Sequence, residues 1–408
     1  MNNKSLKSWG NIEIENTSTS NISDGKPNQL DIGNLNSYGD CCLPIQKVST
    51  VDKSPLVNET VFNYQINQGY YLFGTPGKSN VTIGGAVASD THGKDNSWGG
   101  SFYKNVKKLY LSIYGDEIEI SNEKDSELFK ATIGGYGLTG SIKNIELYKN
   151  DINISETYRT FIETGLGIDN LLNSFSARDR EFWVGWINLL DKSFPWVTKR
   201  SVSTKTKINR AAQKNELEIN TRYPFIGKNL FSSLNVVNKI YFQVNKFSNT
   251  KNISFYNTFF PLGFFTDTRN ISKKRKIIQV QFSLPSSEAH LLEPLLTKLI
   301  NKQTPILCSI KRLSKQDFLN NLSFYQDGWT VAVDFSYFEF NKTEIKKFYE
   351  ELAKCGGKIY LAKDSTLDEK NFKLMYPEFA EWEKVVKSAD PKNLYQSNLS
   401  WRLGLKKW

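Results

Sequence analysis

The stretch that decides the fold is Val81-Thr-Ile-Gly-Gly-Ala-Val-Ala-Ser-Asp-Thr-His-Gly-Lys94. Its apolar start predicts the end of a strand, and the pair Gly84-Gly85 predicts a tight turn. Because glycine has no Cβ, backbone N–H groups in this turn can approach a ligand closely. A run of such amides suits phosphate or another anion. A Gly-Gly pair alone is more often an ordinary turn, so other parts of the chain must distinguish a turn from an anion site.

The composition describes a large folded protein with excess positive charge. The chain has 408 residues, 39% of them hydrophobic, which predicts two packed units rather than one small core. The net charge of +11 indicates an anionic substrate, cofactor or partner. Nucleic acid is not the expected partner, because lysine and arginine are scattered and even the run at residues 273–276 is short.

The four cysteines, Cys41, Cys42, Cys308 and Cys355, lack the paired spacing of a zinc site or a disulfide framework. They predict reduced thiols and no metal site. The polar N-terminus has no apolar signal-peptide core, and no apolar run is long enough to cross a bilayer. These features predict a soluble cytoplasmic protein, and they leave peripheral contact with the inner face of a membrane open.

Hydrophobic periodicity predicts an α+β protein. Strands are expected at residues 106–114, 117–121, 142–148, 182–186, 239–244, 277–282 and 329–335. Helices are expected at residues 126–131, 287–302, 342–354 and 368–375. Residues 115–116 are expected to form a hairpin turn, and the chain beyond residue 375 is expected to be mostly loop. From about residue 150 to 345, strands and helices follow no regular βαβ rhythm, which predicts an antiparallel sheet.

Several further motifs accompany the opening stretch in a fixed order. They are Ser37-Tyr-Gly-Asp40, Thr82-Ile-Gly-Gly85, His92-Gly-Lys94, Ala131-Thr-Ile-Gly-Gly-Tyr-Gly-Leu-Thr-Gly140, Gln279-Val-Gln281, Tyr360-Leu-Ala-Lys-Asp364, Asp390-Pro391 and Arg402-Leu-Gly-Leu405. Together they resemble the FAD-binding oxidoreductases of the vanillyl-alcohol-oxidase (PCMH) type, in particular the decaprenylphosphoryl-β-D-ribose 2′-oxidases. The resemblance extends from about residue 31 to the C-terminus.

The resemblance implies a two-domain flavoprotein. Residues 1–150 and the returning segment 346–408 would form the FAD domain, and residues 151–345 an antiparallel-sheet substrate domain over the flavin. The FAD domain is shortened relative to the family. Leu35 and Asn36 stand where the family usually has glycine and arginine, which predicts weaker or rearranged contacts with the FAD diphosphate. Tyr38 stands where covalent branches carry histidine, so noncovalent FAD is expected.

The resemblance also assigns individual residues. The cofactor-binding residues would be Ser37, Tyr38, Gly39, Asp40, Gly77, Thr82, Ile83, Gly84, Gly85, Ser89, Asp90, Thr91, His92, Gly93, Ile142 and Tyr360. The substrate-binding residues would be Lys94, Gln281, Lys311 and Lys363. Without the resemblance, each glycine is more simply a turn residue, Ile142 a core residue and each lysine a surface charge.

The implied reaction is oxidation of a sugar hydroxyl to a keto group by hydride transfer to flavin N5. The substrate would be a polyprenyl-phosphate-linked or other activated sugar in cell-envelope or glycan biosynthesis. Lys363 would be catalytic, stabilising developing negative charge in a closed site. Two further lysines, Lys94 and Lys311, suit a phosphate, and His92 would orient the loop rather than act as a base.

The resemblance also implies a short-chain reductase as partner. Two alternatives stay open. Because fold does not determine substrate, a sugar-lactone or aldose oxidase is one of them. A non-catalytic relic that binds a partner is the other, motivated by the shortened first domain and by Leu35 and Asn36.

Overall fold

The computed structural model describes residues 7–10, 29–45, 47–48, 52–176, 180–213, 234–248, 250–260, 276–316, 320–337 and 340–408. Most of the polar N-terminus and most of the basic run at residues 273–276 lie outside these ranges. None of the helices in the described ranges combines the length and apolar content that a membrane span requires.

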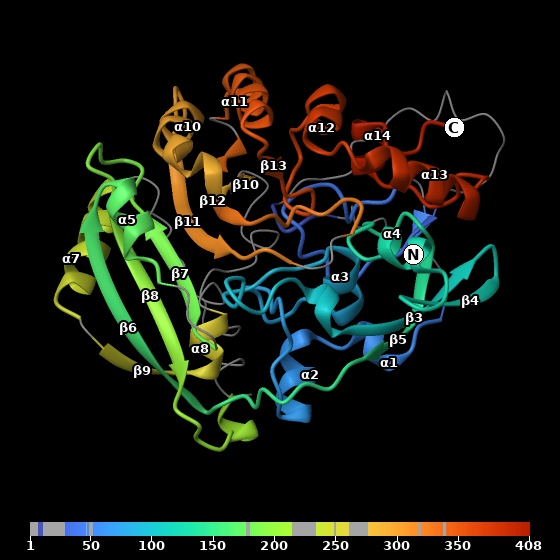
Figure 1. Cartoon of the computed structure of the whole chain (residues 1–408), viewed down its shortest axis with the longest axis horizontal. Coiled ribbons are helices and arrows are strands. Elements are labelled where there is room, and N and C mark those ends of the chain that lie inside the picture. Colours follow the sequence, from blue (N-terminus) through green and yellow to red (C-terminus); the bar gives the residue numbers. More distant parts are fainter. Residues whose placement is uncertain are drawn as a thin grey trace.

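The largest element is an eight-stranded antiparallel sheet, which confirms the predicted α+β class (Figure 1). In spatial order its strands are β13 (Lys358–Ile359), β10 (Ile277–Pro285), β12 (Gly328–Ser336), β11 (Pro305–Leu313), β7 (Phe182–Ile187), β8 (Pro195–Ser203), β6 (Thr157–Leu166) and β9 (Thr250–Ser254). The strands predicted at residues 182–186, 277–282 and 329–335 are confirmed as β7, β10 and β12. The prediction missed β6, β8, β9, β11 and β13.

The two faces of this sheet differ because side chains alternate along each strand. On β10, Val280 and Phe282 are buried in the main core, and Phe282 packs against Phe348 with ring centroids 5.3 Å apart. Helices α10 (Leu292–Leu299) and α11 (Lys342–Lys354) cover this face (Figure 1). The predicted helix at residues 342–354 is therefore confirmed, and that at residues 287–302 becomes a 3₁₀ turn, η4 (Ser286–Leu291), followed by α10. The opposite face of β10 carries Gln279 and Gln281.

A second, three-stranded sheet has the order β4-β3-β5. Its strands β3 (Val106–Ile113), β4 (Asp116–Ser121) and β5 (Ser141–Leu147) confirm three predictions. The hairpin turn lies at Tyr114 and Gly115, one residue earlier than predicted, and both have positive φ. Between residues 29 and 260, the described ranges also contain β1 (Gln29–Leu30), β2 (Lys47–Val48), α1 (Pro55–Asn58), α2 (Val61–Gln68), α3 (Ile83–Ala88), η1 (Phe102–Asn105), α4 (Ser126–Thr132), α5 (Ile168–Ser174) and α8 (Phe255–Phe259).

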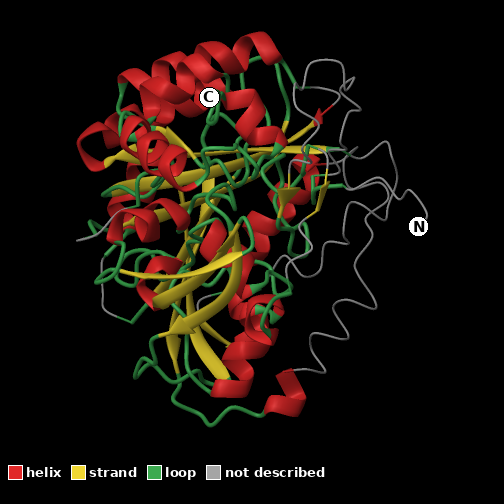
Figure 2. Ribbon diagram, turned by 90° about the vertical axis from the view of Figure 1, so that its right-hand side faces the viewer, coloured by secondary structure: helices red, strands yellow, loops and turns green. Residues whose placement is uncertain are grey.

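The C-terminal segment is helical: α12 (Glu369–Met375), α13 (Phe379–Ala389) and α14 (Asn398–Leu403). The prediction of loops beyond residue 375 was therefore wrong. Trp382 on α13 donates from Nε1 to the Ala131 carbonyl at 3.0 Å, and the Tyr395 hydroxyl donates to the Ser112 carbonyl at 3.0 Å. The end of the chain thus packs against the three-stranded sheet and α4, and Figure 2 shows the C-terminus among helices gathered at one end.

One predicted strand, at residues 239–244, is instead part of helix α7 (Leu234–Lys246). The short window suggests alternation because Ile240, Phe242 and Val244 fall at every second position. Over a wider window, Val236, Ile240 and Val244 recur every four residues, which is a helical period. The prediction failed because the window was shorter than two helical turns.

Candidate active site

A cleft of about 1330 Å³, partly open to solvent, lies between the loops of residues 31–42 and 76–92 and the polar face of the large sheet. The 1330 Å³ includes space that is open to solvent. The predicted site residues that line it are Ser37, Tyr38, Gly77, Thr82, Gly85, Ser89, Thr91, His92, Gln281, Lys311, Tyr360 and Lys363.

The sheet wall of the cleft follows from strand register. Residues that face each other in an antiparallel pair project from the same side of the sheet. Gln281 on β10 pairs with Ala332 on β12, and Ala332 pairs with Ser309 on β11. Two residues further along each strand, and so on the same face, Lys311 pairs with Thr330. These five residues all line the cleft, so three strands supply one row of amide, hydroxyl and ammonium groups.

The opening glycine stretch forms α3, so the predicted tight turn at Gly84-Gly85 was wrong. Thr82 caps this helix, because its Oγ1 accepts a hydrogen bond from the Gly85 N–H at 3.1 Å. Gly84 is small for a packing reason: a Cβ there would lie 2.7 Å from Cγ1 of Val57 on α1. Ile83 and Gly84 are therefore buried against α1, while Gly85 and Ala88 of the same helix line the cleft.

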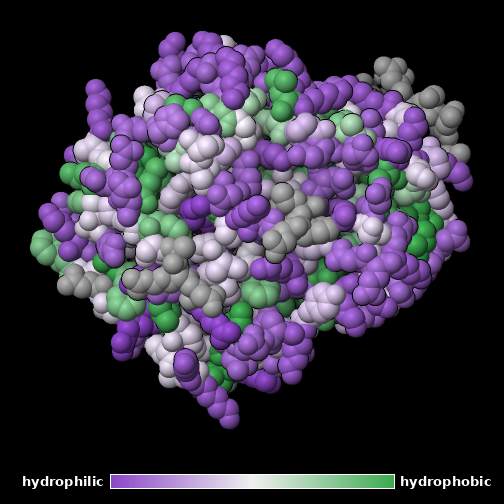
Figure 3. Space-filling model, viewed as in Figure 1, coloured by the Kyte–Doolittle hydropathy of each residue, from purple (hydrophilic) through white to green (hydrophobic). Residues whose placement is uncertain are grey.

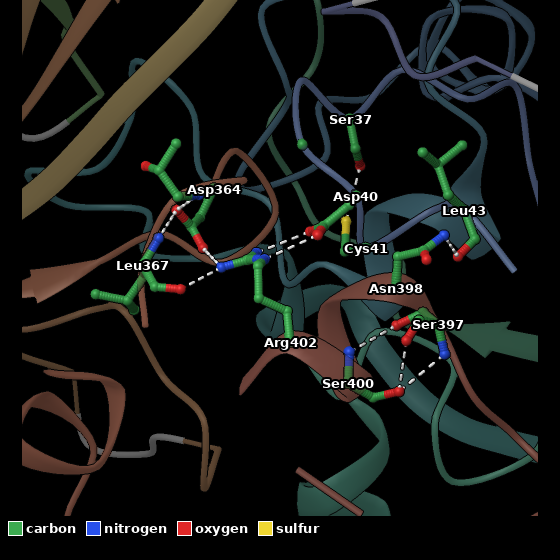
Figure 4. A network of polar contacts seen from close by, with 12 residues as sticks. Ser37, Asp40, Cys41, Leu43, Asp364, Leu367, Ser397, Asn398, Ser400 and Arg402 are labelled. Carbon is green, nitrogen blue, oxygen red and sulfur yellow. Dashed lines mark hydrogen bonds and ion pairs between the residues drawn. The ribbon is translucent and has the colours of Figure 1, made fainter. Parts of the chain in front are cut away.

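Gly39 and Asp40 do not line the cleft themselves, but they fix its loop to the C-terminal segment. Figure 4 shows Asp40 with Arg402 and Asp364. A Cβ on Gly39 would lie 1.7 Å from the Asp364 carbonyl oxygen, so only glycine permits this approach. Arg402 donates to both carboxylate oxygens of Asp40, at 2.9 and 2.8 Å, and pairs with Asp364 at 2.8 Å. Its guanidinium also donates to the Leu367 carbonyl. One arginine on α14 thus joins two loops that border the cleft.

Two more predicted cofactor residues, Asp90 and Gly93, also support the loop from outside the lining of the large cleft. Asp90 accepts from the Tyr103 N–H at 2.9 Å and from Asn320 Nδ2 at 2.8 Å. Burial raises the pKa of Asp90 to about 6, although hydrogen bonds from Ser101, Tyr103 and Asn320 oppose the shift. At Gly93 a Cβ would lie 2.4 Å from Asp95 Oδ1.

Ile142 does not line the cleft. It lies on β5 opposite Leu111, is 5% exposed, and packs in the core of the three-stranded sheet. The structure therefore places it in the core position that the sequence suggests without the resemblance.

The predicted substrate lysines form a basic cluster of partly buried side chains. Burial lowers the pKa of Lys363 to about 8, with Asp334 and Cys41 opposing the shift. Burial and the charge of Lys363 lower the pKa of Lys311 to about 8. Lys94 has a pKa of about 7 because of burial, Lys311 and Lys199. Lys94 does not line the cleft, and its Nζ donates to the Thr258 carbonyl on α8.

Asp334 is a buried carboxylate at this site that the sequence analysis missed. It accepts from Gln279 Nε2 at 2.6 Å, and Lys363 Nζ lies 4.5 Å from the centroid of the Tyr38 ring nearby. Burial raises the pKa of Asp334 to about 6, while Gln279 and Lys363 oppose the shift. The available signal was its position two residues after Ala332 on the same strand, which places both on the cleft side of the sheet.

His92 orients a neighbouring amide. Asn96 Oδ1 accepts from the Gly93 N–H at 2.8 Å, so Asn96 Nδ2 donates to His92 Nδ1 at 3.2 Å. A neutral imidazole then carries its proton on Nε2, 2.9 Å from the amide of Gln281. We therefore assign that amide with its oxygen toward His92. Burial, Lys311 and Lys363 hold the pKa of His92 well below its usual value, so it is neutral at pH 7.

The backbone conformation of Leu35 predicts strain in the loop of residues 31–42, and a substitution can test it. Leu35 lines the cleft with φ of 52°, a left-handed conformation that disfavours a side chain. We expect Leu35→Gly to raise the free energy of unfolding by roughly 1 kcal/mol, measured by urea denaturation. Asn36→Gly is the matched control: its amide donates to the Asn80 carbonyl at 2.8 Å, so its loss should lower stability. Equal changes in the two variants would contradict the strain at Leu35.

The basic cluster predicts an unusual pH dependence of stability. The folded pKa of Lys94, about 7, lies below its ordinary value of 10.5. Between these pH values the unfolded chain binds more protons than the folded one, so stability rises with pH. The gain is about 1.4 kcal/mol per pH unit in that window. Between pH 7 and pH 9.5, the free energy of unfolding measured with urea should rise more for wild type than for Lys94→Met.

The exposed Lys373 supplies the control for this measurement, because its side chain is 51% exposed. Lys373→Met should keep the wild-type pH dependence. If Lys94→Met also keeps the wild-type pH dependence, the lowered pKa assigned to Lys94 is incorrect.

Together the fold and the cleft define an α+β protein with a large ligand cleft, small residues on one wall and buried lysines on the other. No protein-family model matches the chain. The chain is 26% identical over 365 residues to the decaprenylphosphoryl-beta-D-ribose oxidase of Mycolicibacterium smegmatis, across 81% of this chain and 75% of that protein. A shorter match, 35% identical over 74 residues, covers 18% of this chain and 20% of an uncharacterized protein in the mprA 5′ region of Streptomyces coelicolor. This protein is thus a distant relative of the first of these, an oxidase, as the sequence resemblance predicted.

Proposed function

We propose that this protein is an FAD-dependent oxidoreductase that oxidises a hydroxyl of an anionic, polyprenyl-phosphate-linked sugar to a keto group. The observation that carries the proposal is a single cleft that joins a wall of small residues to a buried basic cluster around Lys363. The distant relationship to a decaprenylphosphoryl-beta-D-ribose oxidase supports it.

The small-residue wall fits the extended part of FAD. Gly77, Gly85 and Ala88 line it, and a Cβ on Gly77 would meet no heavy atom of the described residues within 4 Å. In the same wall, Asn36 Oδ1 is buried without a hydrogen-bond partner among the described residues. A hydroxyl or amino group of the adenosine moiety would supply the missing donor. These features fit the cofactor better than a small substrate alone.

When bound, FAD would supply the hydride acceptor for oxidation of the carbinol carbon. The chain's own contribution begins with Lys363, which holds a positive charge in a partly buried wall beside Tyr38. Charge there stabilises an alkoxide more strongly than it would in water. Asp334 opposes the lowering of the Lys363 pKa, so a substantial fraction of this lysine stays protonated near pH 8.

Lys311 and Gln281 would bind the sugar and its phosphate. Lys311 lines the cleft with a pKa lowered by burial and by Lys363, so an anion beside it would offset the repulsion between the two lysines. Gln281 is positioned by His92 and by Thr330, because the amide oxygen that faces His92 also accepts from Thr330 Oγ1 at 3.1 Å. These groups orient the substrate. His92 takes no part as a base, because its Nδ1 lone pair accepts from Asn96 and its Nε2 carries the proton that faces Gln281.

Anaerobic reduction of the FAD-loaded protein by a panel of sugars tests the substrate class. We expect loss of flavin absorbance with a polyprenylphosphoryl pentose, and at least tenfold slower reduction with the same sugar lacking phosphate. Lys311→Met should remove most of that difference. Reduction by aldonolactones or free aldoses alone would favour the alternative lactone or aldose oxidase. A protein that holds FAD and is reduced by none of these would contradict the proposal and favour a non-catalytic role.

A further inference from the structure

Helix α7 carries an exposed apolar stripe. Val236, Ile240 and Val244 are each 57% exposed, and Phe247 just beyond the helix is 83% exposed. The first three recur every four residues and so lie along one side of the helix. Single exposed apolar residues are common, but a contiguous stripe usually marks a contact surface.

The stripe does not face the protein core. The other side of α7 packs on the large sheet, where the Tyr241 ring lies 4.8 Å from that of Trp186. Asn238 donates to Asn188 Oδ1 at 3.2 Å, and Asn245 is 7% exposed. The sheet therefore covers one side of the helix and leaves the apolar stripe exposed.

The helix lies over the same face of the sheet as the cleft. Trp186 on β7 pairs with Ser309 on β11, so their side chains share that face, and Ser309 lines the cleft. Lys199 on β8 has its Nζ 5.6 Å from the centroid of Tyr241. It also acts electrostatically on Lys94. The apolar stripe thus lies beyond the basic end of the cleft.

Charge around the stripe is of one sign. Residues 234–260 contain Lys239, Lys246 and Lys251 but neither aspartate nor glutamate, and these three lysines are exposed. Outside this segment, Asp191 interacts electrostatically with Lys239. At the margin of the molecule where Figure 1 places α7, Figure 3 shows hydrophobic residues among polar ones. An apolar stripe flanked by lysines matches the interface of an anionic bilayer.

We propose that α7 binds an anionic phospholipid bilayer, with its apolar stripe at the headgroup boundary and its lysines on lipid phosphates. This arrangement would direct the basic end of the cleft toward the membrane in which a polyprenyl chain resides. The link to catalysis rests on the proposed function, whereas bilayer binding itself does not.

Flotation of the full chain with phospholipid vesicles tests this proposal. We expect binding to vesicles of 70% phosphatidylcholine and 30% phosphatidylglycerol, and little binding to phosphatidylcholine alone. Lys239→Gln and Lys246→Gln should each weaken binding roughly fivefold. Ile240→Gln/Val244→Gln should weaken it at least tenfold, because both apolar side chains leave the boundary.

Leu374→Gln is the matched control, because Leu374 on α12 is 58% exposed and lies outside the stripe. It should bind vesicles as wild type does. All variants should retain FAD and reduce it at the wild-type rate with a soluble short-chain substrate, which separates bilayer binding from the proposed reaction. The proposal is overturned if wild type ignores the anionic vesicles, or if Ile240→Gln/Val244→Gln binds them equally. It is also overturned if that variant converts a dimer into a monomer, since the stripe would then bind a second copy.

Discussion

Lys363→Met should lower kcat roughly 10²–10³-fold while leaving FAD bound, because it removes one preorganised charge from the reacting centre. Methionine keeps most of the side-chain length, so the Tyr38 ring that Lys363 contacts should stay in place. Stopped-flow reduction of the loaded variant by substrate gives the rate. A separate spectrum of the purified variant gives its FAD content.

Lys363→Arg distinguishes charge from shape. It keeps the positive charge, so it should retain more activity than Lys363→Met while its bulk disturbs the cleft. Lys373→Met, at a lysine 51% exposed on α12, should leave kcat unchanged. Wild-type turnover by Lys363→Met would remove this lysine from the catalytic role.

Arg402→Met should lower the free energy of unfolding by about 3 kcal/mol and release the cofactor. Arg402 pairs with Asp40 and Asp364, whose side chains are 11% and 1% exposed. Removing one partner of a buried ion pair typically costs roughly 3–5 kcal/mol because the remaining charge stays unpaired. The loop that carries Asp40 also lines the cleft. Urea denaturation and the ratio of flavin to protein absorbance measure the two effects.

Arg180→Met is the control, since the Arg180–Asp151 pair is 59% and 84% exposed. Exposed pairs contribute only about 0–1 kcal/mol, so this variant should remain nearly as stable as wild type. If Arg402→Met is equally stable, the contact between α14 and the cleft loop does not hold the site together.

The order of motifs along the chain predicted most of what converges on the cleft. Short motifs located four residues that line the cleft, although they are spread along the chain: Tyr38, Thr82, Gln281 and Tyr360. Asp334 was not found, and the only signal was its position two residues after Ala332 on the same strand. Its role depends on the register between β10 and β12, and a single sequence does not contain that register.

Local conformation was harder to predict than location. The pair Gly84-Gly85 was expected in a turn, yet it lies in helix α3, where the absence of a Cβ serves packing against Val57. Tertiary contact overrides the low helix propensity of glycine there. Helix α7 was also predicted wrongly. Its apolar stretch tolerates either conformation, and it forms a helix where it packs on the large sheet. Domain boundaries near residues 150 and 345 stay predictions.

Equilibrium titration of the cofactor-free protein with FAD tests the central claim most directly. We predict one FAD per chain, with a flavin spectrum perturbed on binding and full release of the flavin on acid precipitation, since Tyr38 provides no covalent attachment. Gly77→Trp, which would fill the small-residue wall where a Cβ has open space, should abolish binding without unfolding the protein. Failure of wild-type protein to bind FAD at any concentration up to 100-fold excess would contradict the account.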